Sequence, residues 1–233
     1  MKVIIDIGSQ KGQEISYFLN RNTEIHSFEP HPIYFSKLRS KFSYYKNVYL
    51  NKSAAWIKKE KQLLHFKGCC FDDNGGASLN HYKNNILYGD SGDEVEEIEA
   101  EFKAQVVMNY WVDRADFVHR DFEIFYANRS VEVQCIDIAE YIYSLQKYIY
   151  LLKIDAEGSE YEILEHLLVS LGKYFLKYNI ENIAIEDHSR KFNSATNKCN
   201  AEYMIKWQEK RKKVLQQYKE HNIILYDWDT FLN

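Results

Sequence analysis

The stretch VIIDIGSQKGQEISYFL, residues 3–19, predicts the beginning of an α/β fold. Val3 to Ile7 is a short apolar run, as expected of a strand that is buried on both faces of a sheet. Gly8 and Gly12 follow it, and a helical pattern then runs from Gln10 to Asn20. A glycine-bearing turn between a buried strand and a helix is a place at which open α/β sheets bind ligands.

Strand and helix patterns alternate through most of the remaining chain. Strands are predicted at 24–28, 47–56, 61–66, 131–136, 148–155, 182–187 and 222–228, with the segment 61–66 in a hairpin. Helices are predicted around 34–42 and at 137–145, 158–171 and 202–221. Such alternation is typical of a doubly wound, mostly parallel sheet in an α/β fold.

The alternation is interrupted between about residues 68 and 130. This segment carries an acidic run, GDEVEEIEAEF, and an aromatic stretch, MNYWVDRADFVHRDFEIFY. It is too long for an ordinary loop, so we expect an insertion within a single domain that spans 1–233. The rings of its aromatic residues either contact a ligand or form the insertion's own core, and they are Tyr110, Trp111, Phe117, Phe122, Phe125 and Tyr126.

The composition excludes several classes of protein. A net charge of −4 does not favour nucleic-acid binding, and the basic run KWQEKRKK at 206–213 is interpreted as the solvated face of a helix. No apolar run reaches the length of a membrane span, and no signal peptide is visible. The four cysteines, Cys69, Cys70, Cys135 and Cys199, lack the paired spacing of a zinc site. We expect reduced thiols and a cytoplasmic protein, in a host cytoplasm if the source is viral.

Two motifs indicate a nucleoside site at the first two strand ends. DIGSQKG, residues 6–12, lacks the GK[ST] of a phosphate loop and is not a full GxGxxG. Taken alone it is either a nucleoside site or a plain strand-to-helix turn. Glu29, in HSFEPHP, ends the second predicted strand, where a carboxylate can accept hydrogen bonds from both ribose hydroxyls. The alternative for Glu29 is a solvated turn carboxylate.

Two further motifs place acidic residues at neighbouring strand ends. In KIDAEGSEYEIL, Asp155 ends a strand that should be central, while Glu157 and Glu160 could instead cap the following helix. In IAIEDHS, the cluster Glu186, Asp187 and His188 ends the next strand. Asp155, Glu186 and Asp187 together would suit Mg²⁺. The alternative is that one or two of them point into solvent or pair with Arg190 or Lys191.

The phrases IDIGSQKGQEI, SFEPHP, LLKIDAEGSEYEIL and IAIEDH, in this order, resemble the FkbM family of class I S-adenosylmethionine-dependent methyltransferases. The resemblance implies a Rossmann-like fold and O-methylation of sugars or small molecules. It implies that Asp6, Gly8, Ser9 and Gly12 border the methionine part of S-adenosylmethionine, and that Glu29 holds the ribose. Ser53 and Ala54 would lie near the adenine. Asp155 and Glu157 would face the sulfonium and the acceptor.

The cluster at the strand ends also resembles metal-dependent catechol and macrolide-sugar methyltransferases more loosely. Those enzymes usually carry a Lys or His base three residues after the first Asp, where this chain has Gly158. His188 is therefore the first candidate for the general base and Glu157 the second. Mg²⁺ on Asp155, Glu186 and Asp187 could hold two hydroxyls of the acceptor.

We therefore expect an O-methyltransferase of a sugar or glycan, for example of a deoxyhexose such as rhamnose, with the insertion recognising the acceptor. The alternatives are a methyltransferase of a small non-sugar metabolite and a cofactor-binding module without transfer activity. The chain starts at its first strand, so we expect either a minimal family member or a domain of a longer protein that also carries glycosyltransferases. The sequence does not specify an oligomeric state.

Overall fold

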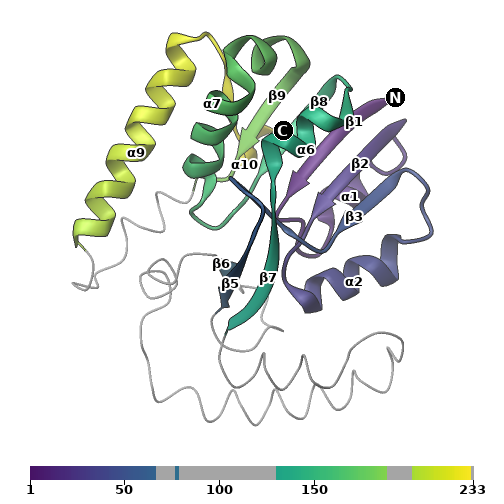
Figure 1. The fold of residues 1–233 in the computed structure, drawn as a ribbon. Coiled ribbons are helices and arrows are strands. Elements are labelled where there is room, and N and C mark those ends of the chain that lie inside the picture. Colours follow the sequence, from purple (N-terminus) through teal and green to yellow (C-terminus); the bar gives the residue numbers. More distant parts are fainter. Residues whose placement is uncertain (67–76, 79–129, 188–200, 232–233) are drawn as a thin grey trace.

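The computed structural model describes residues 1–66, 77–78, 130–187 and 201–231 (Figure 1). Its centre is a six-stranded sheet with the order β10-β9-β8-β1-β2-β3, in which all neighbouring strands are parallel. The strands of this large sheet are β1 (Lys2–Ile7), β2 (Thr23–Phe28), β3 (Val48–Asn51), β8 (Ile149–Ile154), β9 (Ile180–Ile185) and β10 (Leu225–Asp227). The predicted doubly wound, mostly parallel α/β fold is confirmed.

Helices cover both faces of the large sheet because its strands are apolar on both faces. Ile4 of β1 packs with Ile15 and Phe18 of α1 and with Leu38 of α2, on the face that α10 also covers. The opposite face packs against α6 and α7, and α9 lies on the outside of α7 (Figure 1). The helices are α1 (Gln13–Phe18), α2 (Pro32–Phe42), α6 (Ile138–Leu145), α7 (Glu160–Asn179), α9 (Ala201–Glu220) and α10 (Trp228–Phe231).

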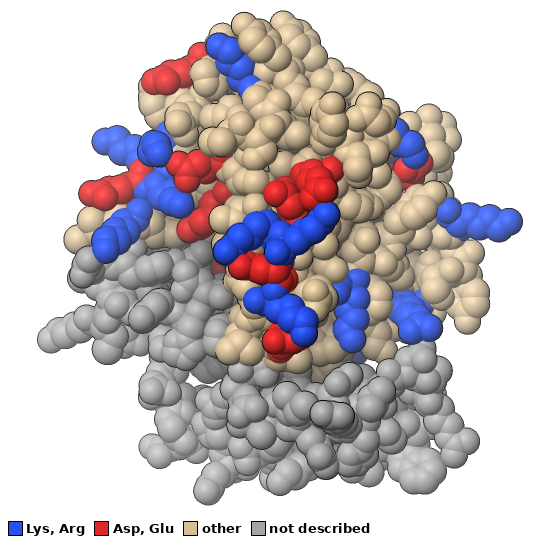
Figure 2. Space-filling view, viewed as in Figure 1, with Lys and Arg blue, Asp and Glu red and all other residues tan. Residues whose placement is uncertain are grey.

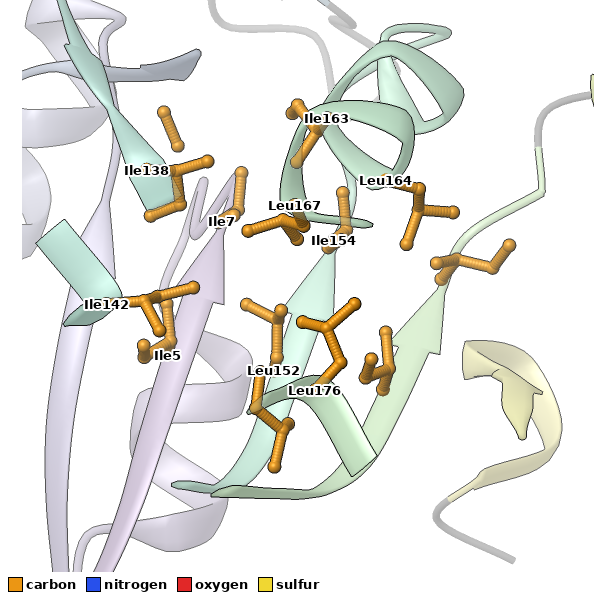
Figure 3. Close-up of a cluster of buried hydrophobic side chains, with 14 of the residues drawn as sticks. Ile5, Ile7, Ile138, Ile142, Leu152, Ile154, Ile163, Leu164, Leu167 and Leu176 are labelled. Atoms are coloured by element: carbon orange, nitrogen blue, oxygen red, sulfur yellow. The ribbon is translucent and has the colours of Figure 1, made fainter. Parts of the chain in front are cut away.

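Figure 3 shows the larger of the two hydrophobic layers. Alternate residues of the central strands, Ile5 and Ile7 in β1 with Leu152 and Ile154 in β8, point toward the helices. They meet Ile138 and Ile142 of α6 and Ile163, Leu164, Leu167 and Leu176 of α7. All ten side chains are at most 3% exposed. This buried layer holds β1 and β8 against α6 and α7, and the site lies at the carboxyl ends of these two strands.

A second, four-stranded sheet has the order β4-β7-β5-β6. It consists of β4 (Ala54–Trp56), β5 (Glu60–Phe66), β6 (Ala77–Ser78) and β7 (Ser130–Asp137). β7 pairs in parallel with β4 and antiparallel with β5. The range 47–56, predicted to hold a third strand and its exit, contains β3 of the large sheet and then β4 of the second. The segment 61–66 pairs antiparallel with β6, the next described strand along the chain, as a hairpin requires. It also pairs antiparallel with β7, which lies far along the chain.

Helix α1 is shorter than the 10–20 range predicted for it, because the chain does not become helical until Gln13. Gln10 and Gly12 both adopt positive φ angles, of 44° and 72°, which a right-handed helix does not allow. Gly12 is the N-cap residue. The turn that precedes α1 is thus longer than the sequence pattern indicated.

The predicted insertion falls largely outside the described residues, apart from β6 and Ser130. Its six aromatic residues also lie outside them, as do His188, Arg190, Lys191, Cys69, Cys70 and Cys199. Within the described ranges, no helix combines the length and apolarity needed to cross a bilayer. On the face shown in Figure 2, Lys and Arg side chains are interspersed with Asp and Glu.

Candidate active site

A pocket lies past the carboxyl ends of β1, β2 and β8, where the second sheet adjoins the large one. The large sheet contributes Ile7, Gly8, Gln10, Phe28, Glu29, Pro30, His31, Tyr34, Asp155, Ala156, Glu157 and Ser159. The second sheet contributes Ala54, Ala55, Trp56 and Leu64. This is the edge at which doubly wound sheets bind their ligands.

The turn after β1 forms one wall of the pocket and approaches the chain after β8 very closely. Gly8 has a φ of +80°, and a Cβ atom built on it would lie 1.9 Å from the carbonyl oxygen of Asp155. Only glycine fits, for reasons of both conformation and space. Gln10, also a lining residue, holds a left-handed φ of 44°, a conformation that costs a non-glycine residue free energy.

Glu29 is an acidic residue of the pocket that the backbone holds in place. Its side chain is buried, and it accepts hydrogen bonds from two backbone N–H groups. Gln10 donates to Oε2 at 2.8 Å, and His31 donates to Oε1 at 2.7 Å. Burial raises the pKa of Glu29 to about 7, although these two N–H groups oppose the shift, while Asp155 and Asp6 add to it. Glu29 is therefore an oriented acceptor whose ionised form is disfavoured by burial.

The turn after β8 forms the opposite wall. Glu160, at the start of α7, is fully buried, and its Oε1 accepts hydrogen bonds from the backbone N–H groups of Gly158, at 2.8 Å, and Ala156, at 3.1 Å. Glu160 thus holds the turn before α7, while the side chain of the N-cap residue of this helix, Ser159, makes no capping hydrogen bond within the described residues. Glu157 instead lines the pocket, with a left-handed φ of 46°. Asp155 lines it as well.

Lys153 lies beneath these two turns, and only 3% of its side chain is exposed. Its Nζ is 3.4 Å from Oδ2 of Asp155, 3.4 Å from Oε1 of Glu14 and 3.5 Å from Oδ1 of Asp6. Burial alone would lower the pKa of this amine, but the surrounding carboxylates outweigh burial and raise it. Lys153 is therefore an ammonium ion and cannot act as a base.

The end of β9 does not supply a ready magnesium site. Asp187 pairs with Arg211 of α9, whose Nε donates to Oδ2 at 3.1 Å, and Asp155 faces the Lys153 ammonium. Among the described residues, no group of three or more His, Cys, Asp or Glu side chains could hold a metal ion. The donor set Asp155, Glu186 and Asp187 does not fit Mg²⁺ in this arrangement, since cations already face two of its three members.

Helix α9 contacts the loop that follows β8 and the loop that follows β9. The indole N–H of Trp207 donates to the carbonyl of Gly158 at 3.1 Å, and the Trp207 ring meets the Tyr161 ring edge-on. Lys210 and Lys213 pair with Glu165 of α7. The run at 206–213 is therefore not simply a solvated face. It also carries the residues that dock α9 beside the pocket.

The cofactor, catalytic and metal residues predicted within the described part of the chain fall into two groups. Gly8, Glu29, Ala54, Asp155 and Glu157 line one pocket. The remaining predicted residues, Asp6, Ser9, Gly12, Ser53, Glu186 and Asp187, are not among its lining residues.

Two residues of the second group have clear structural partners. Ser9 is buried, and its hydroxyl donates to the Asp6 carbonyl and accepts from Ser27. Gly12 approaches α2, since a Cβ atom there would lie 2.5 Å from the Phe42 ring and 2.6 Å from Leu38. Gly12 thus allows α1 and α2 to pack closely.

Several lining residues were missed by sequence reasoning. His31 and Tyr34 form a tilted ring pair with centroids 4.7 Å apart, and burial, with a smaller effect of Lys37, lowers the pKa of His31 to about 3. A neutral imidazole therefore borders the pocket. His31 directly follows the FEP phrase, a signal that was available. Trp56 and Leu64 gave no such signal, because they reach the pocket through the pairing of the second sheet.

The charge of the pocket suits a cationic ligand. Glu29, Asp155 and Glu157 line it, and none of its lining residues within the described part of the chain is Lys or Arg. A sulfonium or ammonium group would be attracted there, whereas a phosphate would not.

Fold and site together define a Rossmann-like α/β domain with an acidic ligand pocket at the carboxyl edge of its sheet. The methyltransferase FkbM domain matches residues 6–214, which is most of the chain. The chain therefore belongs to the FkbM methyltransferase family.

A solved structure that matches the chain is that of the methyltransferase FkbM from Methylobacillus flagellatus KT. The two chains are 11% identical with a TM-score of 0.40, and the match covers 79% of this chain and 32% of that one. The chain thus spans 32% of the length of that relative. No curated protein matches the sequence.

Proposed function

We propose that this chain is an S-adenosylmethionine-dependent O-methyltransferase whose acceptor is a sugar hydroxyl of a glycan or glycoconjugate. The observation that carries the cofactor assignment is Glu29, a buried carboxylate held by two backbone N–H groups past the end of β2. A ribose diol is the ligand that such an acceptor suits. The sugar acceptor rests on the FkbM family resemblance.

The acidic pocket supports a donor that carries positive charge. S-adenosylmethionine, when bound, supplies a methyl group already activated by its sulfonium. The residues of this chain then have to align donor and acceptor, exclude water and accept the proton of the acceptor hydroxyl. Asp155 and Glu157 line the pocket and are candidates for contact with the acceptor. His188 remains the first candidate for the base and lies outside the described residues.

The first test is calorimetric titration with S-adenosylmethionine and S-adenosylhomocysteine. We expect micromolar dissociation constants for both. Absence of binding would contradict the proposal, because Glu29 would then have no ribose to hold. Transfer of a labelled methyl group to a panel of rhamnose-containing and other glycans then tests the acceptor, with small phenols and amines as the contrasting panel.

Two variants separate binding from chemistry. Glu29→Ala should weaken the binding of S-adenosylhomocysteine, because the ribose loses its acceptor. His188→Ala should slow transfer while the dissociation constant stays at the parent value. Transfer by His188→Ala at the parent rate would assign the base to another residue.

A further inference from the structure

Lys153 contacts both turns that line the pocket, although it does not itself line it. Its Nζ lies 3.4 Å from the carbonyl oxygen of Gly8, in the turn after β1. It lies equally far from Oδ2 of Asp155, in the turn after β8. One buried ammonium thus bridges the two walls from below.

These two turns also approach each other very closely. The Gly8 position meets the Asp155 carbonyl so closely that a single added carbon would overlap it. A shift of either turn would change the distance between Gly8 and Asp155, both of which line the pocket. A group that holds both turns therefore sets the width of the pocket between them.

The residues around Lys153 hold its ammonium group at a fixed position. Asp6 is fully buried, and neither of its carboxylate oxygens has a hydrogen-bond partner among the described residues, so its charge faces the ammonium at 3.5 Å. Glu14 of α1 faces it from another side. The Trp228 ring of α10 lies 5.5 Å from Nζ. Carboxylates and packing thus fix the amine in place without solvent.

We propose that Lys153 is a positioning residue for cofactor binding, which acts through the Gly8 turn and Asp155 rather than by touching the ligand. This inference rests on the proposed function, since its test measures the binding of the cofactor. Its alternative is that Lys153 only balances buried negative charge and leaves the geometry of the pocket unaffected.

The two roles differ in their effect on a charged and a neutral ligand. S-adenosylmethionine carries a sulfonium charge that S-adenosylhomocysteine lacks. If Lys153 only balances charge, Lys153→Met should leave the affinity for S-adenosylhomocysteine unchanged and strengthen that for S-adenosylmethionine, because a positive charge has been removed nearby. If Lys153 positions the turns, the variant should bind both ligands more weakly.

The experiment is calorimetric titration of the parent chain and Lys153→Met with both ligands, well below each protein's melting temperature. We expect both dissociation constants to rise by about tenfold or more, as when a supporting residue releases the groups that contact a ligand. Lys147→Met is the matched control, because Lys147 pairs with buried Glu24 at 2.6 Å at the opposite edge of the sheet. It should bind both ligands as the parent does.

Each other outcome is decisive. An affinity of Lys153→Met for S-adenosylhomocysteine within about twofold of the parent overturns the inference. If Lys153→Met does not fold, the double variant that combines Lys153→Met with Glu14→Gln is titrated in the same way. The second substitution removes one of the carboxylates that would otherwise be left without the ammonium. Failure of this double variant to fold would assign Lys153 to folding alone. A parent chain that binds neither ligand would instead refute the proposed function.

Discussion

Gly8 shows how a single backbone position determines the shape of the pocket. Gly8→Ala should destabilise the chain strongly, because the left-handed φ costs about 1–3 kcal/mol and the overlap with the Asp155 carbonyl adds to that cost. Chemical denaturation measures the change in the free energy of unfolding. Gly172 is the control, since its φ is +78° but no atom lies within 4 Å of an added Cβ. Equal losses in both alanine variants would show that the close approach is unimportant.

Glu29 should make cofactor binding depend on pH. Its pKa is about 7 in the free chain, and ligand hydroxyls that donate to it favour the ionised form. The free protein therefore binds a proton that the complex releases, so affinity rises with pH. Between pH 6 and pH 8 the dissociation constant of S-adenosylhomocysteine should fall roughly tenfold.

The same measurement on Glu29→Gln should give weaker binding that no longer changes over this pH range. Glu24→Gln is the matched control, because Glu24 is also a buried acid but lies at the start of β2, at the opposite edge of the sheet. It should keep the pH dependence of the parent. A parent profile that is flat from pH 6 to pH 8 would show that Glu29 does not titrate on binding.

At the scale of elements, helix α9 lies on the outside of α7 and contacts the turn after β8, which forms one wall of the pocket. Trp207→Phe keeps a ring against Tyr161 but removes the hydrogen bond to Gly158, so stability should fall by about 1 kcal/mol. Cofactor binding should weaken as well, because Gly158 adjoins the lining residues Glu157 and Ser159. Denaturation and calorimetry measure the two effects separately.

Tyr218→Phe provides the comparison on the same helix. The Tyr218 hydroxyl donates to the Leu164 carbonyl at 2.9 Å, and its side chain is also buried. This variant should lose a similar amount of stability while its dissociation constant for S-adenosylhomocysteine stays unchanged. If both variants weaken binding equally, α9 would affect the pocket only through general stability.

At the scale of the whole molecule, a bound cofactor would contact residues of both sheets. S-adenosylhomocysteine at a hundredfold excess over its dissociation constant should add about 2.7 kcal/mol to the free energy of unfolding. For a chain of this size the melting temperature should rise by roughly 5–10 °C, which thermal scanning measures.

The same scans also test the predicted magnesium site. Because Arg211 and Lys153 already face Asp187 and Asp155, we expect the shift to be equal in Mg²⁺ and in a chelator. A further rise in Mg²⁺ that Asp187→Asn abolishes would restore the metal site that the sequence suggested.

The sequence by itself determined the large sheet and the main acidic residues of the pocket. Apolar runs such as Val3–Ile7 and 148–155 predict buried strands, because a strand with apolar side chains on both faces has to be covered on both faces. Gly8, Glu29 and Asp155 were visible because each stands at the end of such a strand, and Glu157 because it follows Asp155 closely. Parallel strands bring their carboxyl ends to one edge. Their roles toward a ligand remain predictions.

Only the tertiary structure decided what surrounds these residues. Lys153 meets Asp6 and Glu14, Arg211 meets Asp187, and Trp207 meets Gly158 through packing between elements that are far apart in sequence. The second sheet likewise depends on β7 joining β4 and β5 across the long intervening segment. Side-chain partners of this kind follow from three-dimensional packing, which the periodicity of a single strand or helix does not encode.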